Sequence, residues 1–324
     1  MKIRKLLSGA LAALLAFSCA VSVPSLAATE KGIVGTIKGG PNIPSGANIE
    51  YWGPESDLTD STGYTVSYEL YVPTTILEKN QPGLHVDTCL PFWLESEGKA
   101  GQLLAESFDF GLDEEIWVNH WDEATQTDMD APYATVTKVD DMYKVTVTDI
   151  TVDSKLYSDE WDDSINGFKE WTDAVPTSTG ISARVSIYKD SSKSFSTKFS
   201  VTNVVIKKNG EVVFSSDVSG SDKIGGTYTN ADDIYTEEAA QSFNTKGLTV
   251  SKTKATIKKG KKTTAKVTTM FSGDKVTVKT SKKKVATASY KNGKVTIKGV
   301  KKGKATITVS SAYGKKTIKV TVKK

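Results

Sequence analysis

The chain contains very little cysteine. Its two copies are Cys19 and Cys89, and Cys19 lies in an apolar N-terminal segment that resembles a cleaved leader. One remaining thiol excludes an intramolecular disulfide, so a secreted form must rely on the size of its apolar core. We expect Cys89 to be a buried small hydrophobic residue and not a nucleophile, because an isolated thiol is weak evidence for catalysis.

Histidine is equally scarce, with His85 and His120 as the two copies. This scarcity disfavours a His-centred catalytic triad and a zinc site. The sequence also lacks the H-E-x-x-H and G-x-S-x-G motifs and a phosphate-binding loop. We therefore predict no catalytic residues and no cofactor.

Long apolar runs are confined to the N-terminus. Three basic residues precede the apolar segment 6–20, and Ser25-Leu26-Ala27 supplies small residues before a cleavage site. This pattern predicts a secretory signal peptide over residues 1–28. A lipoprotein leader with Cys19 as the lipidated residue is the alternative, although bulky Phe17 fits a lipobox poorly. No later apolar run approaches the roughly 20 residues of a membrane helix, so we expect a secreted, extracellular protein, free or associated with the cell wall.

Charges of opposite sign are divided between two parts of the chain. Residues 30–244 contain 15 Lys and Arg against 37 Asp and Glu, whereas residues 245–324 contain 24 Lys and one acid, Asp274. All six tryptophans lie between Trp52 and Trp171. We predict an acidic, aromatic-rich recognition domain over residues 29–216, a linker over 217–244 and a basic domain over 245–324.

Both parts consist of short alternating runs that are typical of β-strands. Lys208-Asn209-Gly210-Glu211 predicts a hairpin with a type I′ turn. Helical periodicity over three turns is absent. The pattern predicts an all-β chain with an N-terminal two-sheet β-sandwich of jelly-roll type. The strands expected in this domain lie near residues 32–38, 47–52, 63–72, 84–94, 103–110, 114–121, 133–139, 142–150, 181–188, 198–207 and 211–216.

Two stretches interrupt these strands. Residues 151–180 are expected to form a long connection that contains Trp161 and Trp171, which either cap a binding site or fill the sandwich edge. Residues 217–244 are rich in Gly, Ser, Thr and acids, so we interpret them as a linker, part of which can pair as an edge strand.

The C-terminal part carries a specific resemblance. Its motifs are Lys284-Val285-Ala286-Thr287-Ala288-Ser289, then Asn292-Gly293-Lys294-Val295-Thr296, then the run 302–309 (KGKATITV). With the closing strand 317–322, this progression resembles the bacterial immunoglobulin-like group 2 domain over residues 247–323. The resemblance implies a small immunoglobulin-like β-sandwich on a secreted or surface protein, and it implies no catalysis. A Lys-Thr-Ser-Lys run stands where many members have Trp-Ser-Ser.

Alternation of side chains assigns one face of each strand to the core. In 114–121, for example, Ile116 and Val118 point inward, whereas Trp117, Asn119 and Trp121 point outward. If four of the expected strands share one sheet, their outward residues form one candidate binding face. Its members are Trp93, Trp117, Trp121, Tyr71, Tyr188, Asp87, Glu69, Asn119, His85 and Arg184.

This mixture suits a polysaccharide, because sugar C–H faces pack on aromatic rings while the hydroxyls need directional polar partners. Trp117 and Trp121 are roughly 13 Å apart along an extended strand, comparable to two or three sugar rings. The run 64–73 (YTVSYELYVP) with a later Val-rich hairpin resembles jelly-roll carbohydrate-binding modules. Acidic charge argues against nucleic acid. The leading hypothesis is a secreted, monomeric, non-catalytic polysaccharide-binding protein.

Two alternatives remain open. A jelly-roll glycosidase would need two facing carboxylates, and the candidates are Glu69, Asp87, Glu106, Asp109 and Glu115. Glu106 and Asp109 are expected on opposite faces of one strand. The other alternative is a structural or adhesive surface protein whose tryptophans all lie in the core. Asp140-Asp141 and the acidic run 159–163 would offer oxygen ligands to a structural calcium ion.

The basic domain has a surface that attracts polyanions. On a secreted bacterial protein, an anionic cell-wall polymer is the expected partner. The alternative is a solvated spacer kept soluble by self-repulsion, and we favour a spacer with weak electrostatic retention at the wall.

Overall fold

The computed structural model describes residues 29–41, 46–56, 60–94, 99–172, 179–216, 224–229 and 241–324. The predicted signal peptide and most of the predicted linker lie outside these residues. Among the described residues, no helix is long and apolar enough to cross a membrane. The one helical turn in them is η1 (Thr74–Ile76), and the rest of the regular structure is β.

The N-terminal domain contains most of the strands. They are β1 (Thr29–Gly39), β2 (Gly46–Ser56), β3 (Tyr64–Pro73), β4 (Leu84–Leu94), β5 (Lys99–Ala105), β6 (Phe108–Leu112), β7 (Ile116–Asp122), β8 (Thr127–Asp130), β9 (Ala134–Val139), β10 (Met142–Asp162), β11 (Gly167–Glu170), β12 (Thr179–Tyr188), β13 (Phe195–Lys208), β14 (Glu211–Ser215), β15 (Ile224–Thr229) and β16 (Gln241–Asn244).

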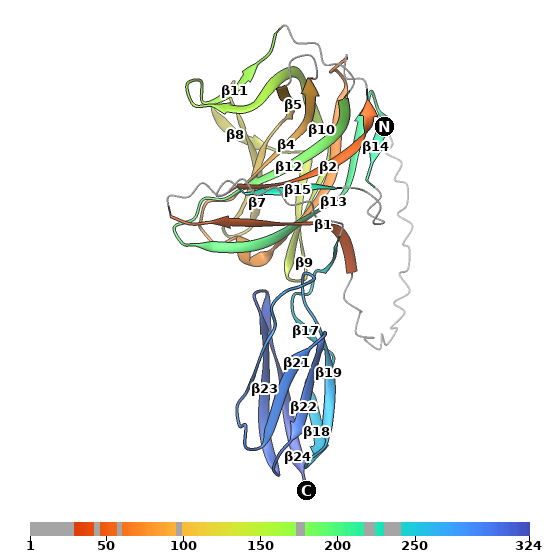
Figure 1. The fold of residues 1–324 in the computed structure, drawn as a ribbon. Helices are drawn as coiled ribbons and strands as arrows, with labels where there is room; N and C mark the ends of the chain where they lie inside the picture. Colours follow the sequence, from red (N-terminus) through yellow and green to blue (C-terminus); the bar gives the residue numbers. More distant parts are fainter. Residues whose placement is uncertain are drawn as a thin grey trace, which may run out of the picture.

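These strands form two layers, which we call sheet I and sheet II. Sheet I has the order β15-β2-β12-β4-β5, and β6, β7 and β8 extend it from β4. Sheet II has the order β3-β13-β1-β16, with β14 beside β13. The long strand β10 belongs to both, because its first half pairs with β3 and β9 and its second half pairs with β5 and β11. Figure 1 shows β10 running through the upper domain.

The core lies between the two sheets. Val86 and Val185 of sheet I and Val66, Val145 and Val201 of sheet II are all fully buried in it. Each of them alternates along its strand with a polar or half-exposed neighbour, as a two-layer β structure requires. The prediction of an all-β sandwich is confirmed.

The prediction of a long loop over residues 151–180 was wrong. β10 continues to Asp162 and turns back as β11 to form a hairpin. Its polar residues lack the alternation that marks a half-buried strand, so local pattern gave no signal. Trp171 packs edge-on against Phe92 at 6.4 Å and fills the edge of the core. At the other predicted hairpin, Asn209 and Gly210 have φ of 51° and 85°, which matches the expected type I′ turn.

The second domain is a smaller sandwich of two four-stranded sheets, β17-β19-β22-β21 and β18-β24-β23-β20. β18 and β24 pair in parallel and the other ladders are antiparallel. Val295, Ile297, Ile307, Val309 and Ile318 are fully buried between the sheets. Its strands are β17 (Thr249–Val250), β18 (Lys254–Lys258), β19 (Lys262–Thr268), β20 (Thr277–Thr280), β21 (Ala286–Lys291), β22 (Lys294–Gly299), β23 (Gly303–Ser311) and β24 (Gly314–Lys323).

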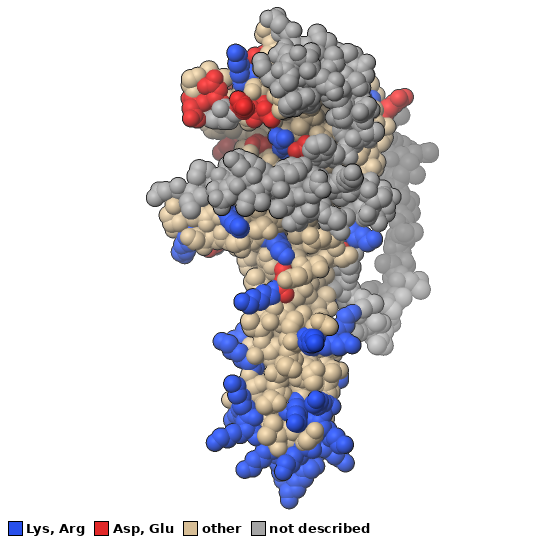
Figure 2. Space-filling model, in the orientation of Figure 1, with Lys and Arg blue, Asp and Glu red and all other residues tan. Residues whose placement is uncertain are grey.

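The two domains differ in surface charge as their sequences predict. Figure 2 shows acidic side chains on the upper domain and a concentration of lysines at the lower end of the second domain. The acid of the second domain, Asp274, lies at its other end and forms an ion pair with Lys198 of β13.

A ladder of four aromatic rings joins the domains. Tyr71 of β3 contacts Phe243 of β16 at 5.1 Å between ring centroids, Phe243 contacts Phe271 at 6.0 Å, and Phe271 contacts Tyr313 at 5.3 Å. Met142 and Met270 are buried beside them. Part of the predicted linker is therefore strand β16, which pairs with β1 and places Phe243 in this junction.

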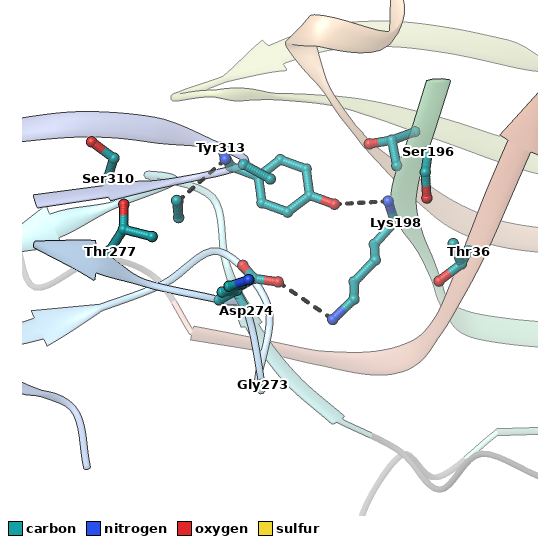
Figure 3. Close-up of a pocket in the computed structure, with 12 residues that line it drawn as sticks. Thr36, Ser196, Lys198, Gly273, Asp274, Thr277, Ser310 and Tyr313 are labelled. Carbon is teal, nitrogen blue, oxygen red and sulfur yellow. Dashed lines mark hydrogen bonds and ion pairs between the residues drawn. The ribbon is translucent and has the colours of Figure 1, made fainter. Parts of the chain in front are cut away.

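Polar contacts surround the aromatic ladder. The Lys198 backbone N–H donates to the Tyr313 hydroxyl at 2.9 Å, and its ammonium lies 3.3 Å from Asp274 (Figure 3). On another side, the Asp141 N–H donates to the Thr245 carbonyl at 2.8 Å and the Thr245 hydroxyl donates to Asp140 at 2.7 Å. Apolar packing and directed hydrogen bonds together predict a junction that holds the domains as one body.

Replacing Phe271 with Ala tests this junction. Loss of a fully buried ring costs about 3–5 kcal/mol, and we expect calorimetry to resolve two separate unfolding transitions where the wild type unfolds with its domains coupled. Tyr290→Ala is the control, because it removes a half-buried ring that packs on the core of the second domain and does not belong to the aromatic ladder. Equal effects of the two substitutions would contradict the coupling.

Candidate functional site

A large cavity lies on the outward face of sheet I. It has a volume of about 1010 Å³ and is floored by β2, β12 and β4, with β5 and the β10–β11 hairpin at its side. We call it the groove. Its polar floor and wall residues are Asn48, Glu50, His85, Asp87, Thr88, Gln102, Ser107, Asp159, Glu160, Arg184, Ser186 and Tyr188.

Strand alternation places these side chains in the groove. Along β12, Ala183, Val185 and Ile187 are fully buried in the core, so Arg184 and Tyr188 point to the other face. The register then brings neighbours together, because Tyr188 pairs with His85 and Ser186 with Asp87. The structure thus places four of the predicted site residues, His85, Asp87, Arg184 and Tyr188, in one cavity.

His85 lies between two carboxylates. Its Nε2 is 2.9 Å from Asp87 and its Nδ1 is 3.1 Å from Asp109 of β6. Burial disfavours the charged ring, but the hydrogen bonds and charges of Asp109 and Asp87 outweigh it and raise the pKa of His85 to about 10. The ring is therefore an imidazolium at neutral pH that cross-links β4 and β6 and donates a proton on each side.

A second charged pair lies further along the floor. Arg184 Nε donates to Glu50 at 3.1 Å, and the Ser182 hydroxyl donates to the other Glu50 oxygen at 3.2 Å. Glu50 is buried and depends on these partners. Cys89 pairs with Arg184 in the β4–β12 ladder, and burial raises the pKa of its thiol to about 12, so the thiol stays protonated and is a poor nucleophile.

Strand β7 forms a ledge beside the groove. Asn119 pairs with Asp109, which continues the row from Tyr188 through His85. Trp121 is 50% exposed and presents its indole to solvent. Trp117 is half-buried, and its ring lies over Gly111 and Gly83, where any Cβ would collide with it. The lack of side chains at these two glycines lets the ring lie flat against the backbone.

Two predicted site residues lie elsewhere. Glu69 and Tyr71 belong to β3 in sheet II, so the expectation that this strand shares the sheet of β4 and β12 was wrong. Glu69 forms an ion pair with Lys144. Tyr71 is 3% exposed and packs in the aromatic ladder between the domains. Both side chains point away from the core, and the junction with the second domain covers Tyr71. Trp93 pairs with Ala100 through its backbone, and its side chain lies outside the described residues.

Sequence reasoning missed several groove residues. Glu50 and Asn48 alternate with buried Ala47, Ile49 and Tyr51, so the pattern of β2 contained the signal. Asp109 was considered as a catalytic carboxylate and not as the partner of His85. Gln102 and Asp159 have no local signal, because they reach the groove through the pairing of β5 and β10.

Two of the acids that could offer oxygen ligands to a calcium ion accept hydrogen bonds within the protein. Asp140 accepts a hydrogen bond from Thr245 in the domain junction, and Asp162 accepts two from Ser164 in the β10–β11 turn. Within the described residues, no three His, Cys, Asp or Glu side chains are arranged to hold a metal ion. Glu106 forms an ion pair with His120 on the other face from Asp109, and Glu115 is exposed before β7.

Comparison with known proteins identifies the second domain. The family model of the bacterial Ig-like domain (group 2) matches residues 244–322, which confirms the resemblance found over residues 247–323. The resemblance of the first domain to jelly-roll carbohydrate-binding modules is not confirmed and stays a prediction. No match was found among curated proteins.

The solved structures that match include three of the S-layer protein SbsC. Domains 4 and 5 share 25% identity with a TM-score of 0.23, covering 31% of this chain and 64% of that one. Domains 4–9 share 17% identity with a TM-score of 0.23, covering 73% of this chain and 30% of that one. The structure of residues 31–844 shares 12% identity with a TM-score of 0.24, covering 80% of this chain and 53% of that one. This chain thus spans less than two thirds of each, and such TM-scores carry no functional argument.

The ion pairs of His85 with Asp87 and Asp109 can be tested by NMR titration of the His85 imidazole carbons. We expect the ring to remain protonated through neutral pH and to titrate near pH 10. This pKa lies above that of an unfolded histidine. The contribution of the His85 ion pairs to the free energy of unfolding is therefore fully present below about pH 6.5 and is lost as the pH rises through the folded pKa. Asp109→Asn should shift the titration towards neutral pH. A wild-type titration near pH 6.5 would contradict the geometry.

Proposed function

We propose that the first domain binds a polysaccharide in the groove and on the β7 ledge without cleaving it, and that the immunoglobulin-like domain spaces it from a bacterial surface. The observation that carries the proposal is the continuous outward row Tyr188–His85–Asp109–Asn119, flanked by exposed Trp121. It combines ring faces with directional donors and acceptors on one rigid sheet.

The aromatic groups are accessible to a ligand. Tyr188 is 37% exposed at the groove, and its ring is 6.0 Å from that of His85. Trp121 is exposed on the ledge, beyond Asn119. An exposed indole next to polar side chains suits a sugar ring, which stacks on the indole while its hydroxyls bond to the polar groups. Without a ligand, the same apolar surface is exposed to water at a cost in free energy.

The charges of the groove restrict the ligand. Glu50, Asp87, Asp159 and Glu160 line it with two cations, Arg184 and His85, and both cations are already paired with carboxylates. An excess of carboxylate repels uronate or sulfated chains. The groove therefore favours a neutral polysaccharide or one with amino groups.

The proposal of a non-catalytic role rests on the carboxylates. Asp87 and Asp109 both hold the imidazolium of His85, which occupies the space between them. A glycosidase pair instead flanks the bond that it cleaves, with the sugar between the two acids. Glu106 points to the other face and pairs with His120.

The role of the second domain as a spacer follows from its arrangement. It is an elongated sandwich attached below sheet II, and the groove lies on sheet I (Figure 1). The aromatic ladder fixes the orientation of the second domain relative to the first. The second domain would therefore hold the groove at a distance from a surface to which it is attached. Secretion and the cell-surface location are part of the proposal.

Binding of the mature chain to a panel of neutral, amino and uronate polysaccharides tests the function. We expect a neutral or amino polysaccharide to bind, and Trp121→Ala to weaken its binding about 5-fold, as loss of one stacked ring costs roughly 1 kcal/mol. Val212→Ala is the control, because Val212 is also an exposed large apolar residue but lies on β14 of sheet II.

Three results would contradict this function. They are binding of uronates alone, equal affinity of the two variants, and release of reducing sugar that Asp109→Asn abolishes. The last would show that the groove is a glycosidase site.

A further inference from the structure

We infer that the end of the second domain farthest from the junction is a binding site for a flexible phosphodiester polymer of the bacterial wall. We call this end the lysine pole. It carries the lysines of three turns, the adjoining strand ends and the last strand: Lys258, Lys259, Lys261, Lys262, Lys282, Lys283, Lys284, Lys298, Lys301, Lys302, Lys323 and Lys324. The inference does not depend on glycan binding by the groove.

Strand register brings these lysines together. β18 ends beside the end of β24, where Lys258 pairs with Lys323. β19 starts beside the end of β22, where Lys262 pairs with Lys298. Residues far apart in sequence therefore meet at one end of the sandwich.

Backbone hydrogen bonds tie the turns to one another. Lys259 N–H donates to the Lys323 carbonyl at 3.0 Å, and Gly260 N–H donates to Gly299 at 2.8 Å. Lys301 N–H donates to Val285, at the end of the 282–284 turn, at 3.2 Å. The positions of the charges are thus set by ordered backbone, and Figure 2 shows them as a cluster at the bottom of the molecule.

The charge of the pole has no counterpart within its domain. All twelve side chains are exposed. Asp274 lies at the opposite end, where it is mostly buried against Lys198. The ammonium groups repel one another, so a polyanion that neutralises them stabilises the folded domain.

The composition of the pole selects the kind of polyanion. The pole has no arginine, so it lacks the planar fork for oriented, bidentate phosphate recognition, and it has no aromatic ring for stacking on bases. It also lacks the aromatic residues that anchor proteins at membrane interfaces. Convex turns covered with lysine suit diffuse, multivalent attraction to a flexible chain of phosphates, which an exported protein meets in a cell wall.

The test is binding of the full mature chain to poly(glycerol phosphate) at several salt concentrations. The pole variant carries Lys259→Gln, Lys261→Gln, Lys301→Gln and Lys302→Gln. The control carries Lys291→Gln, Lys294→Gln, Lys315→Gln and Lys316→Gln, which remove the same charge from exposed sites nearer the junction. The logarithm of the binding constant falls linearly with the logarithm of the salt concentration. We expect the magnitude of this slope to decrease by about 3 in the pole variant, and by less than half of that in the control.

A second readout is the melting temperature of the chain, whose domains unfold together. Poly(glycerol phosphate) should raise it in the wild type and the control, and much less in the pole variant, which also checks that the variant is folded. Equal losses in both variants would overturn the inference, because binding would follow net charge alone. So would salt-insensitive binding, or tighter binding per charge to duplex DNA or anionic vesicles. Failure of every glycan to bind the groove would leave these results unaffected.

Discussion

The interaction on which the groove depends is the imidazolium of His85 held between the carboxylates of Asp87 and Asp109. Without its positive charge, two anions on adjacent strands would face each other across the floor. With it, β4 and β6 are cross-linked on the outward face, and the row of polar groups continues from Tyr188 to Asn119. Both ring nitrogens of His85 are bonded to carboxylates of the protein, so His85 holds neighbouring strands in place. The exposed side chains of Tyr188 and Trp121 are left to contact a ligand.

The distribution of apolar and polar residues explains how much the sequence predicts. In β12 and β7, alternation with fully buried Val185 or partly buried Val118 identified the outward residues, because one face of each strand packs on the core. The same rule placed Tyr71 outward, which is true of its strand, but the second domain covers that face. Domain docking joins residues that are far apart in sequence, and alternation contains no information about it.

Alternation of apolar and polar residues does not identify strands that are exposed on both faces. β8 has four exposed residues, and the end of β10 with β11 is largely polar, so neither has an apolar periodicity. Both were missed, whereas β15 and β16 are the parts of the segment 217–244 that pair as edge strands, which the sequence had left open. The second domain shows the opposite case, because its motif-rich strands form a complete small core and its family was identifiable from the residues alone.

The measurement that tests the account most directly is chemical-shift mapping of the chain with a soluble polysaccharide that binds it. The account predicts that the perturbed amides lie in β4, β6, β7 and β12, around His85 and Trp121. Perturbations confined to sheet II or to the immunoglobulin-like domain would contradict it.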